Sequence, residues 1–178
     1  KEHLASFVPP GYEKIAGKEI HAVHQEDGRT TNGTTEWNAK LLAGNRGVLL
    51  RRKLDYSYPN QKAAVYVAPV TPGKNENELT WQYAGEWYLA GSSTYVFSRP
   101  GGELDARQYN VLTSHRVFRE DEFLIPERLT RDYVNIRIRL KFLPVDQELF
   151  PGHAFPKENK WSELRYDVYS YCLPGYRD

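Results

Sequence analysis

The chain has 178 residues and a mass of 20.6 kDa, with 24 Lys and Arg, 23 Asp and Glu, and 13% aromatic residues. A chain of this length folds as a single domain that buries about 70% of its surface. The formal net charge of +1 excludes the electrostatic pattern of a general nucleic-acid binder, so we expect no nucleic-acid partner. No run of 18 apolar residues occurs, so we expect no membrane partner, and the aromatic content excludes a disordered chain.

The N-terminal segment, residues 1–17, is predicted to be an arm, and residues 18–178 are predicted to form one β-sandwich domain. Phe7 and Val8 make the arm too apolar to remain in water, so we expect it to pack on the domain or on a neighbouring chain. One N-glycosylation sequon follows at Asn32-Gly33-Thr34. Such a sequon is used only on a secretory route, so Asn32 is the predicted glycosylation site of an extracellular protein.

Strand-forming residues are frequent, and Gly and Pro interrupt the chain at short intervals. We expect about eight to ten strands, in the ranges 18–25, 47–55, 62–68, 81–89, 93–98, 111–118, 121–125, 134–142 and 165–172. Residues 62–68 are apolar on both faces, which indicates a strand in the middle of a sheet. Short strands at this spacing predict an all-β fold, which we interpret as a two-sheet antiparallel sandwich.

Polar, turn-rich stretches predict exposed loops at 71–78, 99–102 and 149–160. The dipeptides Asp27-Gly28 and Asn32-Gly33 are also typical of turns. Residues 127–132 are predicted to form one helical turn.

The stretch from Val134 to Phe142 has the clearest pattern in the sequence, because apolar residues alternate there with Arg and Lys. A period of two indicates a half-buried antiparallel strand with a cationic outer face. The residues predicted to form the core are Val134, Ile136, Ile138, Leu140 and Phe142, together with Val65 and Val67.

Aromatic side chains are the residues best suited to bind a carbohydrate, because flat rings stack on a sugar while Trp and Tyr keep a polar group for its hydroxyls. The same rings also fill sandwich cores, and we expect two or three of the four tryptophans there. Trp37 and Trp161 have polar neighbours, and Tyr88 is predicted on the strand face opposite Trp87. The predicted ligand-binding residues are therefore Trp37, Trp161 and Tyr88.

The run Glu120-Asp121-Glu122 is the densest group of acidic residues. Two carboxylates that flank a glycosidic bond can hydrolyse it, but on a strand only Glu120 and Glu122 share a face. The simpler interpretation is a charged turn that leads into Phe123. If the protein is a hydrolase, its acid and nucleophile are expected among Glu36, Glu86, Glu120 and Glu122.

Other catalytic motifs are absent from the sequence. There is no phosphate-binding loop, nucleophile elbow or zinc-protease motif. His21 and His24 are three residues apart, a spacing that suits a helix rather than this strand-like segment, and we expect no metal and no cofactor. The lone Cys172 is predicted to be a buried thiol.

Several segments resemble a known family. They are 47–61 (GVLLRRKLDYSYPNQ), 64–67 (AVYV), 84–92 (AGEWYLAGS), 118–126 (FREDEFLIP), 135–139 (NIRIR) and 161–170 (WSELRYDVYS). Together they resemble the β-sandwich region of glycoside hydrolase family 172, formerly a group of unknown function, and the C-terminal domains appended to it. The resemblance covers about residues 40–172 and implies a jelly-roll fold and assembly into trimers or hexamers.

Enzymes of that family are similar to one another in carrying two jelly rolls in a chain of about twice this length. They cleave furanosides with a pair of glutamates. No segment of this chain matches their glutamate-bearing motifs, so no catalytic residue is carried over. The sequence therefore favours a secreted, non-catalytic carbohydrate-binding or accessory jelly-roll domain associated with polysaccharide degradation. The alternatives are a glycoside hydrolase that acts on furanosides and a structural jelly-roll module that builds an oligomer.

Overall fold

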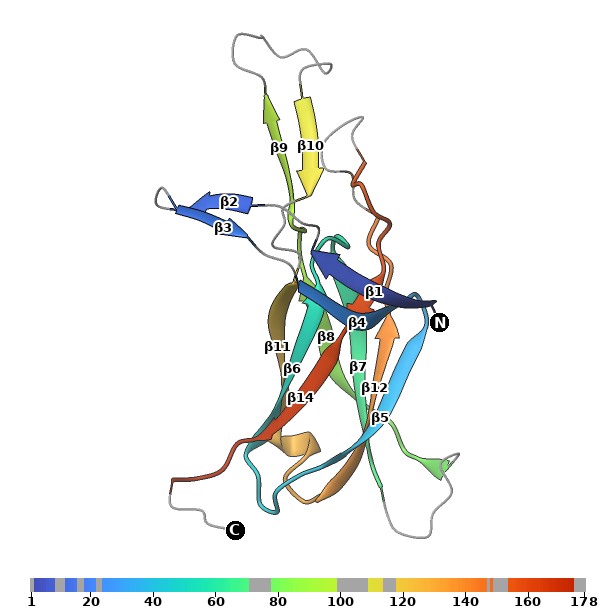
Figure 1. The fold of residues 1–178 in the computed structure, drawn as a ribbon. Coiled ribbons are helices and arrows are strands. Elements are labelled where there is room, and N and C mark those ends of the chain that lie inside the picture. The colour runs from blue at the N-terminus through green and yellow to red at the C-terminus, as the bar shows by residue number, and fades with distance from the viewer. Residues whose placement is uncertain are drawn as a thin grey trace.

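The computed structural model describes residues 2–8, 12–15, 18–21, 24–70, 78–98, 109–113, 118–146, 148 and 154–174. Within these ranges the fold is all-β, with antiparallel pairing and the short 3-10 turn η3 after β11 (Figure 1). The elements are β1 (Glu2–Val8), β2 (Tyr12–Ile15), β3 (Lys18–His21), β4 (His24–Thr31), β5 (Thr34–Lys40), β6 (Gly47–Asp55), β7 (Gln61–Pro69), β8 (Gln82–Leu89), β9 (Thr94–Ser98), β10 (Tyr109–Thr113), β11 (Phe118–Pro126), η3 (Glu127–Leu129), β12 (Asn135–Phe142), β13 (Trp161–Glu163) and β14 (Arg165–Ser170). No helix in the described ranges has the length and apolar content needed to cross a bilayer.

Two sheets supply most of the core. One has the strand order β5-β12-β7-β8 and the other the order β11-β6-β14. A third sheet, β1-β4-β13, joins residues 2–8 of the predicted arm to the rest of the chain through β4. The remaining strands form two antiparallel pairs, β2-β3 and β9-β10. Figure 1 shows β9 and β10 extending beyond the ends of the two large sheets.

The core lies where the apolar faces of the two large sheets meet. Its buried members include Val48 and Leu50 from β6, Val65 and Val67 from β7, and Ile136, Ile138 and Leu140 from β12. The alternation in β12 therefore predicted the inward face correctly, and β7 lies between two strands as its apolar faces indicated. Phe142 is half-buried against this cluster. Val134 precedes β12 and is 45% exposed, so its predicted place in the core is wrong: the alternation runs one residue beyond the sheet.

Of the two predicted Gly-containing turns, the structure contains one. Asn32-Gly33 does form the bend between β4 and β5, whereas Asp27-Gly28 lies within β4 rather than in a turn. A Cβ at Gly28 would lie 2.9 Å from the Leu164 side chain and 3.3 Å from the Glu163 carbonyl oxygen. Glycine is needed there because the junction of β13 and β14 packs closely on β4.

The strand count exceeds the prediction, because 14 strands lie in the described ranges. β5 has no regular alternation of polar and apolar residues, so the search for a period of two did not detect it. β2, β3 and β13 are only three or four residues long, too short for such a pattern to identify each as a separate strand. The predicted helical turn at 127–132 is present as the shorter η3. The loops predicted at 71–78 and 99–102 lie outside the described residues, apart from Glu78. For 149–160 the described part, residues 154–160, contains no strand.

Arg52 of β6 is fully buried where four strands meet. Its Nε and Nη2 donate to the two carboxylate oxygens of Asp121 at 3.1 and 3.0 Å. Its Nη1 donates to Gln61 at 3.1 Å and to the Ser162 carbonyl at 3.2 Å, and its Cζ lies 3.4 Å from the centre of the Trp161 ring. One cation thus joins β6, β7, β11 and β13, and its partners leave the charge paired rather than isolated in the core.

We expect Ile138→Ala to lower the free energy of unfolding by about 2–5 kcal/mol, because Ile138 is fully buried and its loss leaves a cavity. Lys141→Ala in the same strand, at an exposed position, should change it by less than about 0.5 kcal/mol. Urea unfolding of both variants checks this. Equal destabilisation would show that the inward face of β12 is assigned incorrectly.

Neighbouring arginines in β6 provide a second, matched comparison. Arg52→Met removes the partner of the largely enclosed Asp121 carboxylate, which is 10% exposed, and should cost about 3–5 kcal/mol in the free energy of unfolding. Arg51→Met removes an exposed guanidinium that pairs with Glu122 on the outer face, and should leave stability almost unchanged. Guanidinium chloride unfolding distinguishes the two, and a stable Arg52→Met variant would contradict the role given to this ion pair.

Candidate functional site

The two large sheets are closed on one side and grooved on the other. On the side of β8 and β11, Trp87 stacks on Phe123 with ring centres 5.7 Å apart and donates from Nε1 to Asp121 at 2.9 Å. Gly85, at a φ of +148°, lets the Phe123 ring approach to 3.1 Å of the position a Cβ would take. The opposite side, between the edge strands β5 and β14, holds a groove of about 880 Å³.

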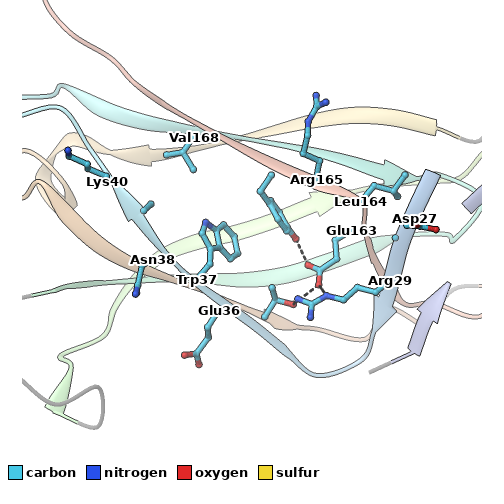
Figure 2. Close-up of a pocket in the computed structure, with 14 residues that line it drawn as sticks. Asp27, Arg29, Glu36, Trp37, Asn38, Lys40, Glu163, Leu164, Arg165 and Val168 are labelled. Carbon is cyan, nitrogen blue, oxygen red and sulfur yellow. Dashed lines mark hydrogen bonds and ion pairs between the residues drawn. The ribbon is translucent and has the colours of Figure 1, made fainter. Parts of the chain in front are cut away.

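Trp37 and Tyr166 form the aromatic lining of this groove (Figure 2). Their rings come from β5 and β14 and stack with centres 4.4 Å apart and an angle of 22° between planes. Both are half-buried, so part of each side chain remains accessible, while the two ring faces that stack on each other are covered. A half-buried aromatic lining beside polar groups is the composition expected of a small-molecule or sugar site.

Glu163 is a buried carboxylate at one end of the groove, with 4% of its surface exposed. Its Oε1 accepts hydrogen bonds from the Arg29 guanidinium and, at 2.8 Å, from the Thr35 hydroxyl. Its Oε2 accepts from the Tyr166 hydroxyl at 2.6 Å. Arg29 also donates to Thr35 at 2.9 Å, so β4, β5, β13 and β14 meet in one hydrogen-bonded cluster.

The Tyr166 hydroxyl is enclosed even though its ring is half-buried. It accepts a hydrogen bond from Trp161 Nε1 at 2.7 Å while it donates to Glu163. Burial raises the pKa of Tyr166 well above its ordinary value, and the nearby Glu163 charge raises it further, while Arg52 lowers it. Tyr166 is therefore held as a neutral hydrogen-bond donor to Glu163.

The structure separates the three predicted ligand-binding residues. Trp37 lines the groove, whereas Tyr88 lies exposed on β8, away from the residues that line the groove. Trp161 is 1% exposed and covered by Arg52, which corrects the expectation of an open sugar-stacking ring there. The polar residues beside Trp161 in the sequence indicated an exposed position, but Ser162 and Glu163 are themselves buried. Asn32 is exposed in the β4–β5 bend, where the Gly33 amide donates to Thr31 Oγ1 at 2.9 Å.

The four predicted glutamates lie on outer sheet faces and each binds a cation. Glu36 accepts from Arg137 at 3.1 Å and from Arg139 at 2.6 Å, and Figure 2 shows its side chain on the other side of β5 from Trp37. The remaining three lie elsewhere: Glu86 pairs with Lys62 at 2.6 Å, Glu120 with Arg165 at 3.2 Å, and Glu122 with Arg51 at 2.7 Å. Glu120 and Glu122 do share a face, and Asp121 between them points inward to Arg52. The predicted charged turn is wrong, because all three residues pair with β6 inside β11.

The sequence analysis missed Glu163, Arg29, Thr35 and Tyr166. A carboxylate set between Trp161 and Tyr166 in a strand-like stretch does indicate a buried acid that needs a partner. Nothing local identifies that partner, because Arg29 is 134 residues away in sequence. Among the described residues, no three His, Cys, Asp or Glu side chains are grouped so that they could hold a metal ion.

Comparison of the chain with protein-family models, with curated proteins and with solved structures yields no match. The resemblance to glycoside hydrolase family 172 therefore stays a prediction.

The raised pKa of Tyr166 predicts a specific dependence of stability on pH. The unfolded chain releases this proton near the ordinary tyrosine pKa and the folded chain only at higher pH, so folding stability is retained below about pH 10 and falls above it. We expect Tyr166→Phe to be less stable at pH 7, because Glu163 and Trp161 lose a partner, and to lose stability less steeply above pH 10. Urea unfolding between pH 7 and 11 measures both slopes, and equal slopes would contradict the raised pKa.

Proposed function

We propose that this chain is a secreted, non-catalytic carbohydrate-binding or accessory domain of polysaccharide degradation, and that the groove between β5 and β14 is its sugar site. The observation that carries the proposal is the half-buried Trp37–Tyr166 pair in a groove of about 880 Å³. A sugar ring presents a flat apolar face and a rim of hydroxyls, and a stacked aromatic lining with polar neighbours complements both.

The polar groups around the rings support this assignment. Asp27 lines the groove and is exposed, so its carboxylate is accessible to the hydroxyls of a bound sugar. Two hydrogen bonds orient the Arg29 guanidinium: its Nε donates to Glu163 and its Nη2 donates to Thr35. A guanidinium carries five N–H donors, so donors remain for a ligand after these bonds are made.

Strand pairing supports the finer part of the fold prediction, a two-sheet jelly roll. β5 pairs with β12, β6 with β11, and β7 with β8, so three pairs are nested in chain order and alternate between the two large sheets. A ribbon of nested antiparallel pairs wound into two sheets is how a jelly roll forms, although a complete one has eight strands. On this interpretation β9-β10 is an inserted hairpin and β14 an addition beside β6.

Secretion is supported by the position of the sequon. Asn32 and Thr34 are exposed at a strand-joining bend, a place that an oligosaccharide can occupy without disturbing the core.

The alternative, a glycoside hydrolase that acts on furanosides, is favoured by one observation: Glu163 is a desolvated carboxylate at the groove. Against it, both Glu163 oxygens are engaged by Arg29, Thr35 and Tyr166, a role that stabilises the fold. A glycosidase also needs a second carboxyl across the scissile bond.

Glycan-array binding followed by calorimetry on the best ligand tests the proposed site. We expect Trp37→Ala to weaken binding about tenfold or more, because a large aromatic contact is lost. Asp27→Ala should weaken it less, and its control, Asp132→Ala, removes an exposed carboxylate outside the groove and should leave binding unchanged. Melting curves confirm that each variant is folded. Undiminished binding by folded Trp37→Ala would remove the groove from the proposal.

A second measurement decides between binding and hydrolysis. We expect no nitrophenol release from aryl furanosides and no new reducing ends from plant or fungal polysaccharides, because Arg29, Thr35 and Tyr166 engage both oxygens of Glu163. Sugar release that is lost in a folded Glu163→Gln variant and kept in Glu120→Gln would establish the hydrolase instead.

A further inference from the structure

The outer face of the sheet β5-β12-β7-β8 carries a row of polar and aromatic residues that the strand register sets side by side. Arg139 lies opposite Glu36 on one neighbour and opposite Tyr66 on the other, and Tyr66 lies opposite Tyr83. Paired positions in adjacent strands point to the same face of a sheet, so these four side chains form one continuous row. The row is on the opposite face of the sheet from the core residues Ile138 and Val65.

Aromatic rings cover the middle of this face. The Arg139 guanidinium lies 3.8 Å from the centre of the Trp81 ring, and the rings of Tyr66 and Tyr83 are 5.5 Å apart at an angle of 58°. Tyr83 is 50% exposed, and Tyr88, further along β8, is 46% exposed. Large aromatic side chains on an open sheet surface are suited to contact with a ligand.

At the outward positions of the four strands, cations outnumber carboxylates on the same face. In its four strands the outward positions hold five cations and two carboxylates, namely Lys40, Lys62, Arg137, Arg139 and Lys141, with Glu36 and Glu86. Glu36 is shared by the two arginines, and Glu86 pairs with Lys62. The excess therefore stays positive, and Lys40 and Lys141 are exposed.

We propose that this outer sheet face is a second binding surface, and that it takes an anionic polysaccharide whose carboxylates meet the cations while its sugar rings lie on Tyr66 and Tyr83. The proposal rests on the proposed function for the chemical class of the ligand, but Tyr66, Tyr83 and Lys141 lie outside the residues that line the Trp37 groove. Charge complementarity selects an acidic chain over a neutral one.

The same chemistry would attract a single-stranded nucleic acid, which also combines charge with stacking. The surface favours the polysaccharide because successive bases stack best on parallel open ring faces, whereas Trp81 is covered by Arg139 and the Tyr66 and Tyr83 rings are tilted by 58°. A sugar ring contacts one tyrosine at a time and needs no parallel pair.

Affinity electrophoresis of the full chain provides the test. The probes are polygalacturonate and the same polymer after full methyl esterification, which removes its charge and keeps its backbone. We expect retardation by polygalacturonate that decreases with salt, and little retardation by the ester. Lys141→Glu and Tyr83→Ala, both at exposed positions, should each weaken polygalacturonate binding at least about threefold. The control Arg128→Glu makes the same charge change in η3, outside this sheet, and should bind as the unmodified chain does.

Trp37→Ala separates this inference from the proposed function. Polygalacturonate binding that survives Trp37→Ala and falls in Lys141→Glu supports the second surface. Binding that falls in Trp37→Ala and is unchanged in Lys141→Glu would overturn the second surface while leaving the groove in place. Absence of polygalacturonate binding, equal binding of the ester, or tighter binding of an oligo-dT probe than of polygalacturonate would each overturn the inference, whatever neutral glycans the groove binds.

Discussion

A single buried guanidinium holds this sandwich together. Arg52 has no exposed surface, and a cation in that position is tolerated only when its charge and its donors are met. Asp121 supplies the charge, while Gln61 and the Ser162 carbonyl take two further bonds. Because these partners come from β11, β7 and β13, the position of one side chain constrains the placement of four strands. The network leaves little freedom for the two sheets to slide relative to each other.

The same network explains why the two sides of the sandwich differ. Asp121 also accepts from Trp87, which draws β8 towards β11 and closes that side with the Trp87–Phe123 stack. On the other side, Trp161 is fixed beneath Arg52 and directs its indole N–H to Tyr166, whose ring then lies against Trp37. The aromatic pair in the groove is thus the outer end of a chain of contacts that begins at the buried cation. Glu163 and Arg29 hold the end of the groove as a second paired charge.

The two proposed binding surfaces use the two faces of one strand. β5 directs Thr35 and Trp37 into the groove, and it directs Glu36 towards Arg137 and Arg139 on the outer face. A ligand in the groove would meet mostly rings and hydroxyl-binding groups, and a ligand on the outer face would meet cations beside tyrosines. An accessory domain with both surfaces could hold a mixed polysaccharide by neutral and acidic segments together, which would raise the overall avidity without a tighter single site.

Local patterns in the sequence were enough for the all-β class, the limits of β6, the inward face of β12 and the central place of β7, because strand periodicity and turn residues act over a few positions. The polar neighbours of Trp37 also indicated a ring outside the core, and it is half-buried at the groove. Tertiary structure alone decided that Trp161 is buried, that Asp121 faces Arg52, and that Glu163 meets Arg29. Each of these depends on a partner at least 69 residues away, and no local pattern encodes which distant strand a buried charge will face.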